Sequence, residues 1–368
     1  MSFPAKYAII ILVYQPKYTI NNNILKNIGV AEAARAIIEN APLIPLYEKK
    51  FQDEARIRTV HFGTHLEGNE LSLTEAAQVI EGQKIVARER DIQEVINYRN
   101  VLKYLDGLEG RKKESGQEYL QEQIKKIHAL TCSKILPDEN CGRFRQSQVV
   151  IRNSQTGEIA FKPPPADEVL LLIKEFFAWL NSRVGFQVHP ILRAGITHYV
   201  LAAIHPFVEG NGRTARAFAI LILFNEGYDI KKLFSIEEYF DREPVAYYEA
   251  LQAVSNQDPK LDERDLTPWL EYFVQGVAIE LNRVKERVQK LSLDVKIKKR
   301  LGQQIALSER QIKLVEHLEE FGEITTAEAK KVLPMISDDT ILRDLKELSK
   351  KGIVKKIGKT KAAKYVMK

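Results

Sequence analysis

Two apolar helical segments joined by one short polar loop constrain the fold of this chain more than any other feature. Residues 191–204 have the spacing of a buried helix, and Pro206 ends it because a proline ring blocks the preceding turn. A second apolar helix is predicted over residues 213–224. Between them the chain reads His-Pro-Phe-Val-Glu-Gly-Asn-Gly-Arg-Thr-Ala-Arg over residues 205–216. The sequence therefore predicts a polar loop held between two core helices.

The residue types of this loop suit a phosphate group. Gly210 and Gly212 permit backbone conformations that point successive N–H groups inward beside a helix N-terminus. Arg213 and Arg216 lie three residues apart, so they share one helix face. A guanidinium group pairs with phosphate oxygens through two parallel hydrogen bonds. The loop is therefore predicted to bind an anion.

Two further residues of the loop bring chemistry beyond anion binding. Glu209 offers a hard oxygen ligand for Mg²⁺, which proteins hold with one or two carboxylates plus substrate phosphates. His205 carries a side chain that accepts a proton near neutral pH. Singly, such residues are more typical of an ordinary turn or helix end. Their combination predicts a nucleotide-phosphate site with its own general base.

Composition narrows the class of protein. A chain of 368 residues has room for two domains, and 45% hydrophobic with 28% charged residues is typical of a soluble globular protein. Cys132 and Cys141 cannot form a disulfide framework, so a reducing cytoplasm is expected. The apolar runs are shorter than the roughly 20 residues that cross a bilayer, so no membrane role is expected. The net charge of +6 is only a weak indication of nucleic acid.

The rest of the pattern predicts a mainly α protein. Helical spacing dominates up to about residue 291, after a strand expected over residues 6–14. Residues 146–161 predict a β-hairpin, and the basic stretch 296–302 is expected to be a connector. Beyond it, three short helices and two basic strands give the outline of a winged helix. The helices are expected to begin at Ser308, Thr325 and Ser337, and the strands to cover residues 353–357 and 364–367.

The loop over residues 205–216 resembles the signature of the Fic-domain AMP transferases, and every fixed position of that signature is filled. The resemblance extends over roughly residues 60 to 290 and includes the hairpin. It implies an N-terminal helical region with an inhibitory motif at residues 1–110 and a Fic catalytic core at 111–292. The hairpin would be a flap of that core, and residues 303–368 would form the winged helix.

The resemblance also implies a role for each residue of the loop. His205 would deprotonate a Ser, Thr or Tyr hydroxyl of a target protein, which then attacks the α-phosphorus of ATP. Glu209 would hold Mg²⁺ on the phosphates, and Arg216 would meet the γ-phosphate. The implied ATP-binding residues are Gly210, Asn211, Gly212, Arg213, Thr214, Ala215, Arg216 and, by a looser alignment, Arg242. The hairpin would dock the target segment as an added strand.

An upstream segment, Gly63-Thr64-His65-Leu66-Glu67-Gly68-Asn69, resembles the inhibitory motif of the same family. In the family, the Glu of this motif reaches the second arginine of the signature. Here that pair is Glu67 with Arg216, and the carboxylate would occupy the fork meant for the γ-phosphate. The family has a Ser or Thr four residues before the Glu, whereas this chain has Gly63 there and Thr64 next to it.

The alternative for Glu67 is an exposed residue without such a partner. Ser72 and Glu75 have capping-box spacing, so a helix is predicted to begin just after the segment. A surface carboxylate before a capped helix would explain the same residues.

The winged helix leaves its partner open. Its third helix and hairpin are rich in basic residues, which suits DNA phosphates. These residues are Arg343, Lys346, Lys350, Lys351, Lys355, Lys356, Lys359, Lys361 and Lys364. Asp338 and Asp339 lie at the start of that helix, where base-reading residues normally lie. A protein partner is therefore an equal alternative.

The sequence as a whole predicts a cytoplasmic, Mg²⁺-dependent, self-inhibited protein adenylyltransferase that uses ATP and a hydroxyl of a target protein. A homodimer and DNA are left open as further partners. One alternative is removal of AMP, or transfer of another phosphate-bearing group, by the same site. Another is a DNA-binding regulator whose nucleotide site is a sensor. His205 distinguishes the sensor from the enzymes, because a sensor has no use for a base.

Overall fold

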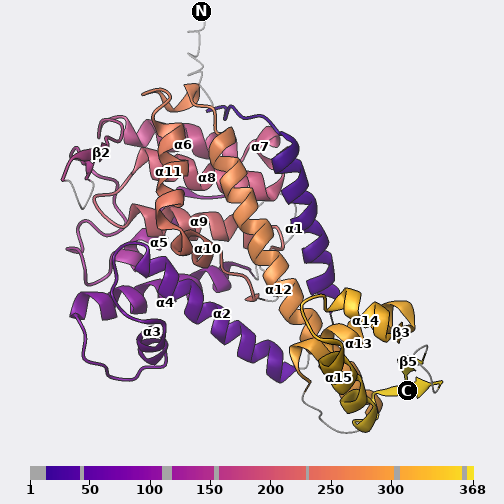
Figure 1. Cartoon of the computed structure of the whole chain (residues 1–368). Coiled ribbons are helices and arrows are strands. Elements are labelled where there is room, and N and C mark those ends of the chain that lie inside the picture. The colour runs from indigo at the N-terminus through magenta and orange to yellow at the C-terminus, as the bar shows by residue number, and fades with distance from the viewer. Residues whose placement is uncertain are drawn as a thin grey trace, which may run out of the picture. The chain divides into compact units, whose positions relative to one another are not determined.

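The computed structural model describes residues 14–41, 45–109, 118–152, 157–228, 232–301, 307–358 and 363–368. The strand expected over residues 6–14 lies outside the described residues except for Tyr14, and so do wing residues 359–362. The chain divides into two compact units (Figure 1). The first takes in the described residues of Met1–Glu39 and Lys49–Arg283, and the second those of Asn40–Glu48 and Val284–Lys368. Among the described helices, none combines the length and apolarity needed to cross a membrane.

Helices dominate the described chain up to residue 301, as predicted. They are α1 (Asn22–Asn40), α2 (Pro45–His65), α3 (Leu73–Ile80), α4 (Glu89–Glu109), α5 (Gln121–Cys132), α6 (Val169–Leu180), α7 (Arg183–Gln187), α8 (Pro190–Ile204), α9 (Asn211–Asn225), α10 (Glu237–Arg242), α11 (Pro244–Ser255), the 3-10 turn η2 (Leu261–Glu263) and α12 (Thr267–Leu301). The basic stretch expected to be a connector is helical as far as Leu301. That expectation was wrong because residues 291–301 contain no glycine or proline that would end α12.

Helices α8 and α9 form the centre of the first unit. They pack along each other, while α4 and α5 lie against α9 and α6 lies against α8 (Figure 1). Gly195 lets α12 approach α8 closely, because a Cβ there would lie 2.9 Å from the Leu270 side chain. Trp269 of α12 donates its indole N–H to the Gly195 carbonyl at 2.8 Å. The loop between α8 and α9 is therefore anchored at both ends in buried helices.

The predicted hairpin is present. Strands β1 (Ile151–Arg152) and β2 (Ile159–Phe161) pair antiparallel, with Ile151 opposite Phe161 and Arg152 opposite Ile159. Most of its turn, residues 153–156, lies outside the described residues. Ile159 is 54% exposed, so the hairpin presents apolar side chains to solvent.

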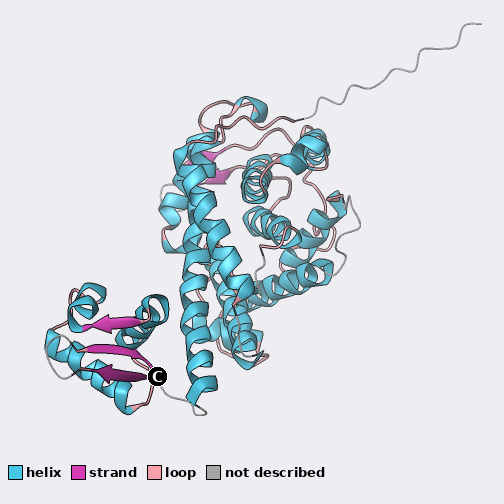
Figure 2. Ribbon diagram, turned by 90° about the vertical axis from the view of Figure 1, so that its right-hand side faces the viewer, coloured by secondary structure: helices cyan, strands magenta, loops and turns pink. Residues whose placement is uncertain are grey.

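The second unit contains a winged helix, whose three-stranded sheet Figure 2 shows beside its helices. Its elements are α13 (Glu309–Phe321), β3 (Glu323–Thr325), α14 (Thr326–Val332), α15 (Asp338–Lys350), β4 (Val354–Ile357) and β5 (Lys364–Met367). Ser308, Thr325 and Ser337 cap the three helices as expected. Strand β3, which pairs with β5, was not predicted, because three residues are too few to show an alternating pattern.

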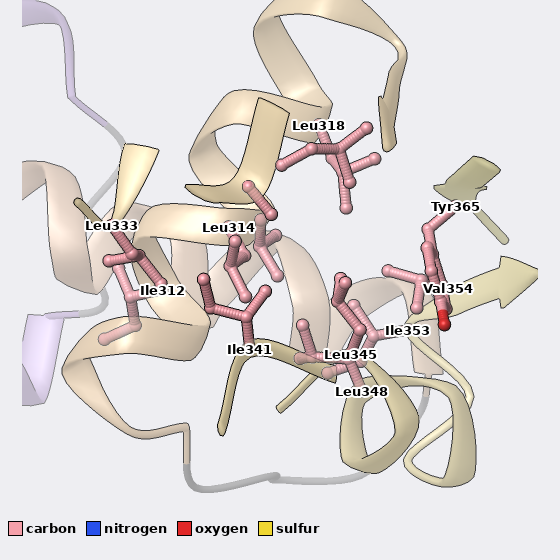
Figure 3. Close-up of a cluster of buried hydrophobic side chains, with 13 residues drawn as sticks. Ile312, Leu314, Leu318, Leu333, Ile341, Leu345, Leu348, Ile353, Val354 and Tyr365 are labelled. Carbon is pink, nitrogen blue, oxygen red and sulfur yellow. The ribbon is translucent and has the colours of Figure 1, made fainter. Parts of the chain in front are cut away.

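The core of the winged helix explains why these short elements hold together. Ile341, Leu345 and Leu348 line one face of α15 and are fully buried. They meet Leu314 of α13 and Val354 of β4 in a single apolar cluster (Figure 3). Helices and strands of this length are marginal alone and depend on such packing.

Candidate active site

His205 ends α8 in a strained backbone conformation. Its φ of 51° and ψ of 59° lie in the left-handed region, which is uncommon for a residue with a side chain. The ring Nδ1 lies 3.3 Å from the Ala202 carbonyl. A carbonyl can only accept, so Nδ1 carries the proton and Nε2 keeps its lone pair. Burial lowers the pKa of His205 to about 4, so the ring is neutral at physiological pH.

The loop that follows is clamped by its own asparagine. Asn211 Oδ1 accepts from the Phe207 N–H at 2.8 Å, and Asn211 Nδ2 donates to the Phe207 carbonyl at 2.9 Å. Gly210 has a φ of 73°, and a Cβ there would lie 2.7 Å from Cys132 Sγ. Conformation and space therefore both require glycine at this turn.

His128 of α5 supports the loop from below. Its Nδ1 accepts from the Gly142 N–H at 2.9 Å, so its Nε2 donates to the Glu209 carbonyl at 3.0 Å. Its ring also stacks on Phe207, with ring centroids 3.8 Å apart. Burial lowers the pKa of His128 to about 4, which keeps this bridge neutral.

Arg145 joins the loop over residues 205–216 to the hairpin. Its side chain is fully buried, and its guanidinium donates to the His205 carbonyl at 2.8 Å and to the Pro164 carbonyl at 2.5 Å. A third bond reaches the Ser147 carbonyl at 3.2 Å. Ser147 precedes β1 and Pro164 follows β2, so one side chain holds both ends of the hairpin and the end of α8. The five N–H donors of a planar guanidinium group allow one side chain to serve several acceptors in this way.

The two arginines of the loop are buried and paired with acids. Arg213 Nη1 lies 3.3 Å from Glu94 of α4, and Arg216 Nη1 lies 2.8 Å from Glu67. Their side chains are 3% and 1% exposed. Burial acts to raise the pKa of Glu67, but Arg216 and Arg213 outweigh it and lower that pKa. Glu67 is therefore held as a carboxylate against Arg216.

The segment around Glu67 is fixed by contacts on both sides. Arg216 Nη2 donates to the Gly63 carbonyl at 2.9 Å, and Tyr248 donates its hydroxyl to the Leu66 carbonyl at 3.0 Å. A Cβ at Gly63 would lie 2.5 Å from the ring of Tyr98. The family's Ser or Thr would not fit there, which gives a packing reason for the departure from the motif.

Glu67 also meets the glycine of the phosphate loop. A Cβ at Gly212 would lie 2.1 Å from Glu67 Oε1 and 3.1 Å from Arg216 Nη1. The alternative for Glu67 is correct in one respect: α3 does begin with the Ser72–Glu75 capping box just after it. Its side chain is 27% exposed, yet its carboxylate lies on a buried arginine rather than free in solvent.

Glu209 fits one position of a metal site. Its carboxylate pairs with Arg90 of α4, and Arg213 Nη2 lies 3.8 Å away. The described residues contain no group of three or more His, Cys, Asp or Glu side chains that could hold a metal. A single carboxylate suits Mg²⁺ that arrives with a phosphate substrate, and Arg90 would have to release it.

The remaining predicted residues take different places. Thr214 donates its hydroxyl to the Gly210 carbonyl at 2.8 Å, and Ala215 is buried in the core. Arg242 pairs with Glu280 at 2.9 Å and with Glu238 at 3.3 Å. Its assignment to the adenine pocket stays a prediction.

Sequence reasoning missed four residues of the site. They are Arg90, Glu94, His128 and Arg145. No local pattern identifies their partners in the site, because those partners are distant along the chain. Arg90 and Glu94 have the spacing of an i,i+4 pair on α4, but nothing near the buried Glu94 in sequence indicates its contact with Arg213.

The comparisons with known proteins agree with this architecture. Residues 119–223 match the model of the Fic/DOC family, and residues 310–358 match the DeoR-like helix-turn-helix domain. The protein adenylyltransferase Fic of Aedes aegypti is 30% identical over 182 residues, 49% of this chain and 34% of that protein. The corresponding protein of Culex quinquefasciatus is 29% identical over 182 residues, with the same shares. The chain thus spans about a third of the length of these curated relatives.

Solved structures show the same fold. A Fic family protein from Desulfovibrio desulfuricans G20 matches with a TM-score of 0.62 at 21% identity, covering 96% of this chain and 98% of that one. Fic-1 from C. elegans matches with a TM-score of 0.57 at 23% identity, covering 72% and 73% of the two chains. The fold is thus shared with Fic proteins, while the family matches cover residues 119–223 for Fic/DOC and residues 310–358 for the DeoR-like helix-turn-helix domain.

Proposed function

We propose that this protein is an adenylyltransferase that moves AMP from ATP to a Ser, Thr or Tyr hydroxyl of a target protein. The observation that supports it most is the neutral His205 with its free Nε2, which lies at the mouth of a loop with two buried arginines. The similarity to proteins named protein adenylyltransferase Fic supports the same activity.

The reaction balances with the groups present. His205 Nε2 takes the proton of the target hydroxyl while its oxygen forms a bond to the α-phosphorus of ATP. The bond from that phosphorus to the β-phosphate oxygen breaks, and pyrophosphate leaves. The backbone N–H groups at residues 210–212 and the Arg213 guanidinium would donate hydrogen bonds to the phosphate oxygens. Mg²⁺ held by Glu209 would neutralise charge on the α- and β-phosphates.

The resting protein would be inhibited by Glu67. Its carboxylate lies 2.8 Å from Arg216 Nη1, and the buried Arg216 side chain is also held by its bond to the Gly63 carbonyl. A γ-phosphate would have to displace Glu67 or bind elsewhere, so the triphosphate would lie in an unproductive pose. The activity of the intact chain is therefore expected to be low.

Incubation with ATP labelled at the α- or the γ-phosphate tests the reaction. We expect protein-bound label from α-labelled ATP alone, and loss of that label in His205→Ala. Label retained from the γ-phosphate would mean phosphate transfer instead. If the protein releases AMP from a target that already carries it, and attaches no label from ATP to an unmodified target, the site removes AMP instead.

DNA binding is a second function that one observation favours. Residues 310–358 match a DeoR-like helix-turn-helix domain, and Arg343, Lys346 and Lys350 are exposed on α15. The acids at the start of that helix are partly offset, since Lys330 lies 3.8 Å from Asp338. A duplex that binds at low salt and dissociates steeply as salt rises supports this function, and no binding at low salt excludes it.

A further inference from the structure

Two carboxylates and two guanidinium groups form a closed ring of alternating charge beside the loop over residues 205–216. Arg90 of α4 pairs with Glu209, and its Nε lies 3.2 Å from Glu94 Oε1. Arg213 closes the ring, with Nη1 3.3 Å from Glu94 and Nη2 3.8 Å from Glu209. The four side chains therefore balance one another's charge before any ligand arrives.

The two arginines of this ring differ in burial. The Arg213 side chain is 3% exposed, whereas the Arg90 side chain is 57% exposed. A buried guanidinium group is costly to separate from its carboxylate, but an exposed ion pair contributes little because water replaces the partner. Arg213 is thus the fixed cation of the ring, and Arg90 is the replaceable one.

Glu94 keeps Arg90 close to Glu209. Its side chain is 6% exposed, and its Oε2 accepts from Asn69 Nδ2 at 3.0 Å. Asn69 also donates to the Asp91 carbonyl at 3.0 Å, so the carboxylate is held in place from behind. Because Glu94 Oε1 accepts from Arg90 Nε, the terminal nitrogens of Arg90 can leave Glu209 while its Nε stays bonded.

The Glu209 carboxylate needs a cation in either state of the site. A bare carboxylate beside the phosphate groups of a nucleotide would repel them. Mg²⁺ that arrives with the phosphates would supply that cation, and Glu209 suits it as a hard oxygen ligand. Arg90 supplies the cation when no metal is bound, and like charges cannot share the same carboxylate oxygen favourably.

We propose that Arg90 is a specificity-determining residue that takes the place of the metal on Glu209, so that the site accepts a metal-free nucleotide as well as its Mg²⁺ complex. This inference rests on the nucleotide site of the proposed function. With a metal-free nucleotide, Arg90 stays on Glu209 and neutralises it. With the Mg²⁺ complex, Arg90 is displaced from Glu209, which weakens binding of that complex. The site therefore distinguishes poorly between the two forms.

ADP is the probe that tests this, because it has no γ-phosphate to compete with Glu67. Isothermal titration calorimetry on the full chain gives the Kd of ADP in EDTA and in saturating MgCl₂, and the ratio of the first to the second measures the discrimination. Arg90→Gln is expected to raise this ratio about fivefold, the scale of an exposed ion pair. ADP alone then meets an unneutralised Glu209, while the Mg²⁺ complex no longer displaces an arginine.

A merely structural role for Arg90 predicts the opposite sign. If Arg90 only held Glu209 in position for the metal, Arg90→Gln would weaken the Mg²⁺ complex and lower the ratio. Arg90→Lys keeps the charge and is expected to leave the ratio within about twofold of the wild type. Arg88→Gln is the matched control with the same expectation, because Arg88 is 55% exposed and pairs with Glu70 and Asp91.

An unchanged or lower ratio in Arg90→Gln overturns the proposal. An equal rise in Arg88→Gln overturns it as well, since the effect would then be one of net charge. Absence of ADP binding by the wild type under both conditions contradicts the nucleotide site and this inference together. ADP binding needs no transfer of AMP, so a raised ratio in Arg90→Gln supports the inference even if the experiment with α-labelled ATP fails.

Discussion

The phosphate loop and the winged helix treat their positive charges in opposite ways. In the loop, Arg213 and Arg216 are buried, and each lies on a carboxylate of the same chain. On α15, Arg343, Lys346 and Lys350 are exposed to solvent. The arginines of the loop are already occupied by carboxylates, whereas the basic side chains of α15 are open to a partner.

The difference shows what opposes phosphate binding in each region. A buried guanidinium must be paired, so a phosphate group can bind the loop only by replacing Glu67 or Glu94. An exposed lysine meets a phosphate group without rearrangement, but salt screens the attraction. Phosphate binding at Arg216 should therefore depend on one internal competitor, Glu67, and binding at the winged helix on ionic strength.

Replacing the base should have the largest effect. His205→Ala is expected to lower kcat for AMP transfer by about 10²–10⁴-fold, because the proposed general base is lost. Initial rates with α-labelled ATP measure it. The control comes from the winged helix: His317→Ala should keep kcat within about twofold, as expected for surface changes. Equal losses in both variants would mean that the loop histidine is not the base.

Removing the internal competitor should give a gain. Glu67→Gly frees Arg216 and is expected to raise transfer by about ten- to a hundredfold, the scale of a broken buried charge pair. Glu70→Gly is the matched control, since Glu70 pairs with Arg88 on the surface. If the two variants label targets equally, Glu67 does not inhibit the site.

Replacing Arg145, which links the hairpin to the end of α8, should have a smaller effect. Arg145→Lys keeps the charge but cannot reach several carbonyls, so kcat should fall about tenfold and the KM for the target should rise. The KM for ATP should not change. Arg152→Lys, on the exposed hairpin, is the control. A loss confined to the KM for ATP would place Arg145 with the nucleotide instead.

The open region should respond to single charges only weakly. Lys346→Gln is expected to reduce the slope of log K against log salt by about one for a DNA duplex, because one phosphate contact is lost. Fluorescence anisotropy at about 50–200 mM salt measures the slope. Lys26→Gln, at an exposed position of α1, should leave the slope unchanged. Equal changes would make the binding a property of net charge.

Acidity should have the smallest effect near neutrality. Because burial lowers the pKa of His205 to about 4, the base is already neutral at pH 7. The value of kcat/KM should be constant between about pH 5.5 and 8 and should fall only as the ring gains a proton below about pH 5. An acid limb near pH 6.5 would show that the ring is solvated in the working enzyme.

The sequence predicted the parts of the molecule whose causes are local. Helix periodicity, the caps at Ser308 and Thr325, and the polar loop between α8 and α9 all depend on neighbouring residues, and the structure has them. The contacts of Arg145 and Glu94 could not be predicted, because periodicity gives the face of a helix but not its partner. Tyr98 shows the same limit: nothing near it in sequence indicates that it excludes a side chain at Gly63.

The absence of room at Gly212 has a genetic consequence. Any side chain there would strike the Glu67 carboxylate and the Arg216 guanidinium at once. A substitution at that position would therefore dislodge the Glu67–Arg216 contact, which we propose to be inhibitory, and fill the proposed phosphate site in the same event. A selection for constitutively active alleles should recover changes at Glu67 and its supporting residues and none at Gly212. A substitution at Gly212 would thus remove inhibition and activity together, whereas a substitution at Glu67 can remove inhibition alone.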